Sequence, residues 1–486
     1  MKINRNFKEF RFRHRSKNNQ IIFTSKKVKD DSEVIDLIDN FLIDKNSFIF
    51  ESVEKGKIKG RYTIFGKNPD KIWEFNNKSS YLIKNNKKIK LNEDPKFLIE
   101  KIIESFKFKI PSNLPPIASI ISGYFSYDSI RYIEKIPNNC EDDLNIPDVR
   151  LMRPRTLIIY DNLKKKIFYI INVFQDEKIS NYQKKYLEIN TELFQHFNKS
   201  FSQSLKKNNS SKSKKIVVKS NTAKKKFLKM VEKAKKYIKL GDIFQVVLSQ
   251  RFEAKLTKSP LEIYKKLRIT NPSPFMFYFN FKDFQIIGAS PEILVRLRDN
   301  KITVRPIAGT RPRGKTLTQD KFYERDLLKD KKELSEHLML LDLGRNDAGK
   351  VSKINSVKVT ESFIIERYSH VMHIVSNVVG KYNKKFSKFK SLLAGFPAGT
   401  VSGAPKIRAM EIIDELEKTK RKVYAGGIGY FSANGEFDTC IALRTAVAKK
   451  NKFYVQAGAG IVADSKPINE YRETVNKAKA LINALK

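Results

Sequence analysis

The chain has 486 residues, of which 41% are hydrophobic and 11% aromatic, so wholesale disorder is excluded and two or three domains can form. No apolar run approaches the ~18–20 residues of a membrane span, and residues 1–20 lack the apolar centre of a secretory signal. The formal net charge is +44, but lysine is spread along nearly the whole chain, which favours a compositional bias over a nucleic-acid-binding protein.

The first part of the chain mixes short strand patterns with turns, as at residues 156–160 and 167–173. Residues 201–222 are rich in Ser, Asn and Lys, which predicts a linker or a long exposed loop. This break divides the chain into an N-terminal region, residues 1–200, and a C-terminal region, residues 223–486.

The C-terminal region carries clearer patterns. Asp299-Asn300 separates two strand-like runs and predicts a β-hairpin. Helices are expected at residues 331–343, 405–417 and from about 469 onward, and strands at residues 424–431, 442–448 and 453–457. The mixture predicts an α+β (mixed α/β) fold with large sheets.

Two pairs of carboxylates stand at helical spacing. Glu333 and Glu336 are three residues apart, as are Glu470 and Glu473, so each pair projects from one helical face. Like charges there repel, and a hard cation such as Mg²⁺, which prefers oxygen ligands, would relieve the repulsion. The alternative is a solvated helix face or, for the second pair, acids that favour a helix N-terminus.

Three further features have competing explanations. Residues 456–463, QAGAGIVA, match a dinucleotide fingerprint, but no helix can follow directly because Asp464, Ser465 and Pro467 intervene, so NAD binding is rejected. Arg444 is either a structural ion-pair partner or a bidentate clamp on a substrate carboxylate. His373 alone would more often be a hydrogen-bonded core residue than a catalyst.

Taken together, five motifs of the C-terminal region resemble the chorismate-binding enzymes, namely PIAGTRPRG, KELSEHLMLLDLGRND, FPAGTVSGAPK, YAGGIGYF and QAGAGIV. Three upstream stretches, FIFESVEKGKIKGRYTIFG, GYFSYDSIRYIE and RLMRPRTLIIYD, resemble the large subunits of anthranilate synthases within that family. The resemblance implies large, antiparallel-rich sheets flanked by helices and an anthranilate-synthase-like fold. It also implies amination of chorismate with loss of the 4-hydroxyl, followed by elimination of pyruvate.

The resemblance assigns a metal site and a substrate pocket. Glu336 and Glu473 match direct Mg²⁺ ligands, with Glu333 and Glu470 beside them acting through water. Other positions match the substrate pocket, with Tyr424 and Arg444 on the enolpyruvyl carboxylate and Gly309, Thr310, Gly458 and Gly460 around the rest of the molecule.

Catalytic roles are implied in the same way. Glu292 matches the acid that protonates the departing 4-hydroxyl, a task that requires a raised pKa. His373 matches a histidine implicated in the proton chemistry at the ring, and Thr400 is placed with these two.

Two positions distinguish the different reactions of the family. Gln245 stands where a lysine activates water in isochorismate and salicylate synthases, and Ala308 stands where a lysine attacks the ring in aminodeoxychorismate synthases.

This pattern leaves ammonia as the nucleophile. The sequence shows no glutaminase module, so the resemblance implies a separate glutamine amidotransferase subunit, and hence a hetero-oligomer. The alternatives are an aminodeoxychorismate synthase component and, from another class, a basic nucleic-acid-binding protein. Neither nucleic acid nor membrane is an expected partner. Two cysteines, Cys140 and Cys440, cannot form a disulfide framework and fit a reducing cytoplasm.

Regulation by tryptophan is implied by two stretches. Glu51 and Ser52 resemble a tryptophan-binding LLES motif, and Pro274, Phe275 and Met276 belong to a stretch that resembles its NPSPYM partner. This chain departs from the family pattern at Phe50, which replaces a leucine, and at Phe275, which replaces a tyrosine. The alternative is that both stretches pack the two regions together.

Overall fold

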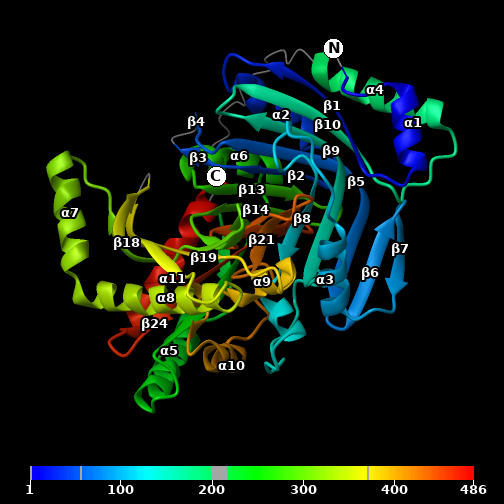
Figure 1. Cartoon of the computed structure of the whole chain (residues 1–486). Coiled ribbons are helices and arrows are strands. Elements are labelled where there is room, and N and C mark those ends of the chain that lie inside the picture. The colour runs from blue at the N-terminus through cyan, green and yellow to red at the C-terminus, as the bar shows by residue number, and fades with distance from the viewer. Residues whose placement is uncertain (1–2, 55–56, 199–215, 369–370) are drawn as a thin grey trace.

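The structure, a computed structural model, describes residues 3–54, 57–198, 216–368 and 371–486. Twenty-two of the described strands form one hydrogen-bonded network, and every ladder in it is antiparallel. Helices lie on the outside of these strands (Figure 1). The predicted α+β fold with antiparallel sheets is confirmed.

The network branches at one long strand, β9 (Val149–Asp161), which pairs with β10, β5 and β8. The first branch runs through neighbouring strands in the order β1 (Gln20–Lys27), β10 (Lys166–Val173), β9, β5 (Tyr62–Asn76), β2 (Ser47–Glu51), β13 (Phe275–Asn280), β14 (Gln285–Ser290), β23 (Thr445–Lys449), β24 (Lys452–Ile461) and β12 (Gln245–Lys255). Strand β12 also pairs with two short strands, β11 (Val218–Ser220) and β20 (Gly403–Ala404).

The second branch begins where β8 pairs with β9, and it includes the strands that carry His373 and residues 308–310 of the predicted site. It continues through β8 (Ile120–Phe125), β21 (Gly427–Ser432), β22 (Phe437–Ile441), β15 (Ile293–Arg298), β16 (Lys301–Val304) and β19 (Val371–Lys381), with β17 (Ile307–Pro312) and β18 (Lys358–Arg367) on β19. Outside these branches, β6 (Ser79–Lys84) and β7 (Lys87–Leu91) extend β5, and β3 (Val53–Glu54) pairs with β4 (Lys57–Ile58).

Apolar side chains fill the space between the two branches and cover their outer faces. The inner core contains strand residues from both branches, among them Phe48, Tyr124, Leu157, Phe277 and Ile428. A second core lies under α1 (Phe7–Arg15), α2 (Ser32–Phe41), α4 (Tyr182–Asn198), α6 (Pro260–Thr270) and α11 (Pro467–Asn483). A third lies under α3 (Pro95–Ser105), α5 (Lys224–Lys239), α8 (Lys331–Gly349), α9 (Lys388–Ala394) and α10 (Lys406–Leu416). Burial on both sides explains the nearly continuous apolar runs of the central strands.

Local patterns account for several elements. Asp299 and Asn300 both have positive φ, 50° and 56°, so they form the predicted hairpin turn between β15 and β16. Asp330 caps α8 by accepting hydrogen bonds from the backbone N–H of Lys332 and Glu333. The predicted helices correspond to α8, α10 and α11. Helix α7 (Leu317–Lys329) stands at the edge of the molecule beside β18 (Figure 1).

Two predicted strands begin later than the sequence pattern indicates. Residues 424–426 form a turn in which Ala425 has a φ of 63°, so β21 begins at Gly427. Arg444 has a φ of 46°, which breaks the predicted strand at residues 442–448, and β23 begins at Thr445. Side-chain alternation alone does not reveal such breaks, because a residue with left-handed backbone keeps its place in the apolar pattern.

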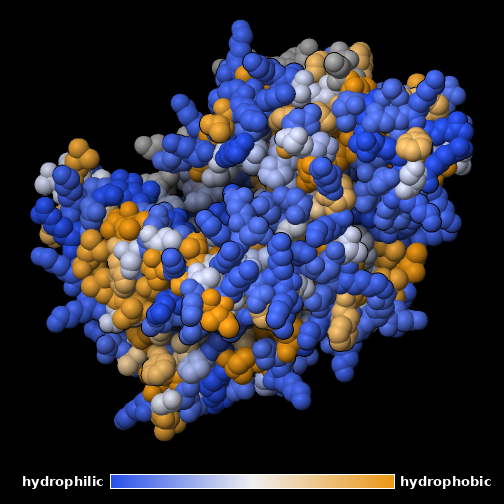
Figure 2. Space-filling model, in the orientation of Figure 1, coloured by the Kyte–Doolittle hydropathy of each residue, from blue (hydrophilic) through white to orange (hydrophobic). Residues whose placement is uncertain are grey.

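The predicted linker at residues 201–222 lies partly outside the described residues, and its last part forms β11 on β12. None of the helices in the described ranges has the length and apolarity needed to span a bilayer. Cys140 and Cys440 are unpaired. Hydrophilic side chains cover most of the face shown in Figure 2, while apolar ones gather toward its lower left.

Candidate active site

Three elements meet at Gln245, the first residue of β12. Its side-chain Nε2 donates a hydrogen bond to Glu336 Oε1 of α8 at 2.8 Å. A Cβ added to Gly460 of β24 would lie 2.8 Å from the same Nε2. Glycine at this position therefore leaves the room that the Gln245 amide needs to reach Glu336.

The Tyr424 side chain likewise requires a glycine in β24, at Gly458, two residues before Gly460. A Cβ on Gly458 would lie 2.6 Å from the Tyr424 Oη. Burial raises the pKa of Tyr424 to about 12, so its hydroxyl keeps its proton at neutral pH. Gly460 and Gly458 thus make room for the side chains of Gln245 and Tyr424. The close approach of a small anion to this backbone stays a prediction.

Glu292 lies where β14 gives way to β15, and only 5% of its surface is exposed. The Thr400 hydroxyl donates to its Oε1 at 3.1 Å. Burial raises the pKa of Glu292 to about 8, against the opposing hydrogen bonds from Thr400 and from the Ile307 backbone. The raised pKa predicted for this carboxyl is confirmed in direction, and the group is mostly protonated at neutral pH.

His373 on β19 faces the turn that follows Ala308. Its Nδ1 lies 2.8 Å from the Gly309 carbonyl oxygen and 3.1 Å from the Thr310 hydroxyl. Because a carbonyl only accepts, Nδ1 carries the proton and Nε2 is left with its lone pair. Burial lowers the pKa of His373 to about 4, so the imidazole is neutral near pH 7 and can accept a proton.

Arg444 lies between β22 and β23, beside the segment that leads to Glu292. Its carbonyl accepts from the Ala289 backbone N–H at 3.1 Å. Its guanidinium makes no ion pair with any residue in the described ranges, and burial lowers its pKa. The structural ion-pair alternative therefore has no partner among these residues, whereas a substrate carboxylate would supply one.

The two carboxylate pairs lie near the N-termini of α8 and α11. Burial and then Glu336 raise the pKa of Glu333, and burial followed by Glu473 raises that of Glu470 against a hydrogen bond from Ser465. Glu470 is in the first turn of α11, as the helix N-terminus alternative requires. Within the described part of the chain, no group of three or more His, Cys, Asp or Glu is gathered closely enough to hold a metal by itself.

Comparison with known proteins shows the family to which the chain belongs. The sequence model for the chorismate binding enzyme matches residues 48–483. The chain belongs to the chorismate-binding enzymes. It is 46% identical to anthranilate synthase component 1 of Cereibacter sphaeroides, over 98% of this chain and 97% of that one, and 44% identical to the protein of the same name from Acetivibrio thermocellus, over 97% and 96%.

Solved structures agree with the family. The crystal structure of anthranilate synthase component I from Streptococcus pneumoniae has a TM-score of 0.77 and 40% identity, and the match covers 87% of this chain and 93% of that one. The menaquinone-specific isochorismate synthase of Escherichia coli has a TM-score of 0.71 at 18% identity, over 98% of each chain, and shows the shared fold alone.

Two residues that contact the predicted site residues were not predicted. Lys477 forms an ion pair with Glu473 at 2.6 Å and donates to the Gly458 carbonyl at 3.0 Å. Its place four residues after Glu473 could have revealed it, because charges at that spacing meet on a helix. Tyr368 has its ring 5.5 Å from that of His373, and its hydroxyl donates to Glu366 at 2.8 Å. No sequence pattern pointed to Tyr368.

Ala308 and Gln245, the two positions predicted to distinguish the reactions of the family, both lie close to the Glu333–Glu336 pair. Ala308 is 9% exposed on β17, one residue before Gly309. A Cβ on Gly309 would lie 3.3 Å from Glu333 Oε2, so the turn after Ala308 approaches the first carboxylate pair closely. Gln245 touches the same pair through Glu336. The structure thus brings both positions to one side of the site.

The residues predicted to bind tryptophan, Glu51, Ser52, Pro274, Phe275 and Met276, gather at a cavity of about 390 Å³, here called the β2–β13 cavity. Tyr368, which lies beside His373, also lines this cavity, so the cavity adjoins the predicted reaction site. Strands β2 and β13 bring them together, because Glu51 pairs with Met276 in their ladder. Glu51 Oε1 accepts from Tyr264 at 2.5 Å and from Arg268 at 2.9 Å, whereas its buried Oε2 has no hydrogen-bond partner among the residues that the structure describes. A buried acceptor is therefore left for a ligand.

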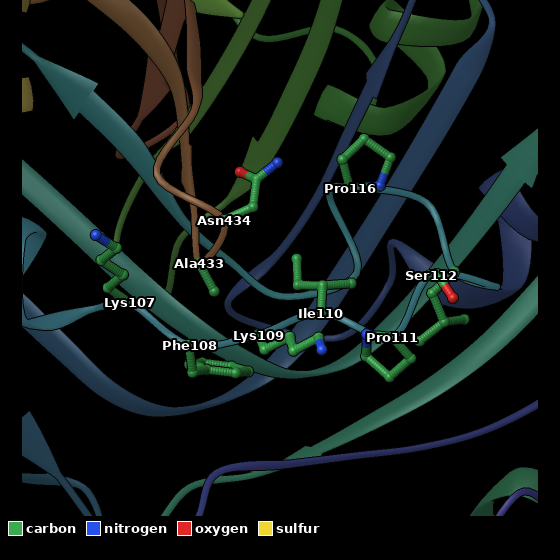
Figure 3. A pocket seen from close by; sticks show the side chains of 10 residues that line it. Lys107, Phe108, Lys109, Ile110, Pro111, Ser112, Pro116, Ala433 and Asn434 are labelled. Atoms are coloured by element: carbon green, nitrogen blue, oxygen red, sulfur yellow. The ribbon is translucent and has the colours of Figure 1, made fainter. Parts of the chain in front are cut away.

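Another cavity, of about 690 Å³, lies between residues 107–116 and the turn at Ala433 and Asn434 (Figure 3). Lys107, Phe108 and Ile110 are among its lining residues. None of the predicted site residues lines it, so the site predictions give it no role.

Proposed function

We propose that this chorismate-binding enzyme aminates chorismate and eliminates pyruvate to leave anthranilate. The full-length similarity to proteins named anthranilate synthase component 1 supports this reaction among those of the family. The observation that carries the proposal is the Gln245–Glu336 hydrogen bond. An amide stands at the position where a water-activating relative has a basic lysine, and an amide side chain offers no basic nitrogen.

The proton chemistry follows from two buried groups. Glu292 is protonated near pH 7 and donates its proton to the departing 4-hydroxyl, which leaves as water. Ammonia in its neutral form attacks the ring at C2 and needs no general base for that attack. Neutral His373 then accepts the proton from ring carbon C2 at its Nε2, while the bond between the ring and the enolpyruvyl oxygen breaks and the ring becomes aromatic. The released enolpyruvate takes up a proton at its methylene carbon and becomes pyruvate.

Substrate orientation is assigned to Arg444 and Tyr424. The unpaired guanidinium of Arg444 binds the enolpyruvyl carboxylate, and the protonated Tyr424 hydroxyl donates a second hydrogen bond to it. Tyr424 is buried and Arg444 is partly buried, and charge-assisted hydrogen bonds are stronger where water is excluded.

Mg²⁺ is part of the proposal, with Glu336 and Glu473 as its protein ligands and Glu333 and Glu470 beside them. The donor set fits, because all four are carboxylates. Burial, with a smaller contribution from the neighbouring carboxylate, raises the pKa values of Glu333 and Glu470, and a bound cation would favour their ionised forms. The absence of a tight three-residue cluster among the described residues also fits, since Mg²⁺ usually binds one or two carboxylates together with an anionic substrate. When bound, the ion would neutralise the ring carboxylate of chorismate and stabilise charge that develops during the reaction.

The name component 1, borne by the relatives, supports a partner subunit. We assign that partner as a glutamine amidotransferase that supplies ammonia, and we assign the complex as a hetero-oligomer.

Feedback inhibition by tryptophan at the β2–β13 cavity completes the proposal. The unpartnered Glu51 Oε2 would accept a hydrogen bond from the ammonium group of the amino acid, and the apolar walls at Phe275 and Met276 suit the indole ring.

One assay tests the reaction. The purified chain is incubated with chorismate, Mg²⁺ and an ammonium salt at mildly alkaline pH, and anthranilate is followed by its fluorescence. We expect anthranilate and pyruvate in equal amounts, only when ammonium is present. Formation of isochorismate, or of aminodeoxychorismate without pyruvate, would assign the chain to another reaction of the family.

A further inference from the structure

A buried ion pair behind the substrate pocket connects elements that carry site residues. Glu417 and Arg421 are four residues apart, and they are 7% and 2% exposed. Arg421 Nε and Nη2 donate to the two carboxylate oxygens of Glu417, at 2.9 and 2.5 Å. The desolvation cost of such a pair is offset only by good geometry and further hydrogen bonds, so the other contacts of the guanidinium are informative.

The guanidinium reaches two backbone carbonyls on separate elements. Its Nη1 donates to the Val401 carbonyl at 2.7 Å, in the short helix η2 (Gly399–Val401), and its Nη2 donates to the Val247 carbonyl at 2.6 Å, in β12. Val401 follows Thr400, whose hydroxyl binds Glu292. Arg421 therefore fixes the turn that holds the acid against the strand that begins at Gln245.

Tyr424 is the third group held by this network. Its ring centroid lies 5.6 Å from the Arg421 guanidinium, and its backbone N–H donates to the Arg421 carbonyl at 3.2 Å. Glu417 is fixed in turn by Ser249, whose backbone N–H and hydroxyl both donate to its Oε1 at 2.8 Å. A planar guanidinium can satisfy all these directions together, and a lysine ammonium cannot.

We propose that Arg421 is a positioning residue for the reaction, which holds Thr400 against Glu292 and Tyr424 against Gly458. Its burial keeps it from touching the substrate, so it acts only through these residues. The role rests on the proposed function, because Glu292 and Tyr424 act in that reaction.

The proposal makes a prediction that a merely structural ion pair does not. If Thr400 moves away, Glu292 loses a hydrogen bond that lowers its pKa, so the pKa rises. The protonated carboxyl is the active form, and the alkaline limb of kcat/KM should therefore move to higher pH. A structural pair would change the melting temperature and leave this limb in place.

The test measures kcat/KM for chorismate against pH, at constant free ammonia, in wild type, Arg421→Lys, Thr400→Val and the double variant. We expect kcat/KM to fall at least about tenfold in Arg421→Lys, since small misplacements of reacting groups are costly. The limb should shift upward equally in both single variants and no further in the double variant. The control is Arg150→Lys, which weakens a comparably buried ion pair with Glu74, 2.9 Å long, and should lower only the melting temperature.

Four outcomes count against the proposal. An unmoved limb in folded Arg421→Lys would overturn it, as would equal limb shifts in Arg421→Lys and Arg150→Lys. If Arg421→Lys does not fold, Glu417→Gln combined with Arg421→Met removes both charges together, and an unmoved limb there would have the same meaning. A wild-type chain that makes no anthranilate would overturn the proposed function itself, and with it the role of Arg421.

Discussion

The predicted reaction site and the β2–β13 cavity differ in how their arginine side chains are paired. Around the cavity, Arg296 pairs with Asp438 at 3.0 Å and Arg305 pairs with Glu366 at 2.6 Å. At the predicted reaction site, Arg444 has no ion-pair partner in the described ranges, although its side chain is only partly exposed and burial lowers its pKa. Burying an unpaired charge costs stability, so the reaction site keeps its guanidinium ready for a ligand that brings the opposite charge.

This difference matches the two ligands assigned to the sites. Chorismate carries two carboxylates, one for the Arg444 side of the site and one for the side of the acidic helices. Tryptophan is a zwitterion with no net charge, and a cavity whose ionic groups are already paired suits it. Isolated buried acceptors, such as Glu51 Oε2 and Asp438 Oδ1, are then enough to orient it.

The most severe way to break the reaction site is to remove a carboxylate from either helix. Glu336→Gln or Glu473→Gln should lower turnover by roughly 10³-fold or more, because metal stabilisation of developing charge amounts to several kcal/mol. Steady-state anthranilate formation is measured across a Mg²⁺ titration. Asp342→Asn is the matched control, since it removes an exposed carboxylate from the same helix α8. Wild-type activity of either glutamine variant at ordinary Mg²⁺ would exclude the assignment.

The next largest effect concerns the acid. Glu292→Gln should lower kcat/KM roughly 10²–10⁴-fold, the usual contribution of a positioned proton donor. In wild type, kcat/KM should fall as the pH rises through about 8, because the carboxylate that forms has no proton to give. The ammonium concentration is adjusted at each pH to keep free ammonia constant. Absence of the alkaline fall in wild type, or its persistence in Glu292→Gln, would contradict this role.

Choice of nucleophile should change less sharply. In Gln245→Lys the introduced amine lies beside Glu336, which favours its protonated form, so it becomes a base mainly at higher pH. We expect the ratio of isochorismate to anthranilate to rise, and to rise further with pH, while total turnover falls. Ala308→Lys serves as the contrasting variant and should only lower activity. Product chromatography with no isochorismate, despite chorismate binding, would show that pocket shape rather than the missing base excludes water.

The cavity can be altered with little effect on the reaction. Ser52→Ala should relieve inhibition by tryptophan while turnover without tryptophan stays near wild type. Ser52 lines the cavity and makes none of the contacts described for Glu292, His373 or Arg444. A bulkier residue at Met276 should act in the same direction. Inhibition curves measure the shift. A wild-type enzyme indifferent to millimolar tryptophan would remove the regulatory proposal and leave the catalytic one standing.

The sequence predicted much of this arrangement, but not its reasons. Local signals sufficed for the hairpin at Asp299-Asn300 and for α8, since turn chemistry and the helical spacing of leucines act over a few residues. The left-handed backbone of Arg444 was missed, because it depends on the neighbouring strands β14 and β24 rather than on local pattern. Likewise, the glycines of β24 make room for Gln245 and Tyr424, which are more than thirty residues away in sequence.

The most direct test of the contrast between the two sites is a crossed binding measurement. Chorismate and tryptophan are each titrated, by calorimetry and without ammonium, into Arg444→Lys and Ser52→Ala. Arg444→Lys should weaken chorismate roughly 10–100-fold through the loss of charge-assisted hydrogen bonds, and leave the Kd for tryptophan unchanged. Ser52→Ala should weaken only tryptophan. Chorismate binding of wild-type strength in Arg444→Lys, or equal loss of both ligands in either variant, would contradict the account.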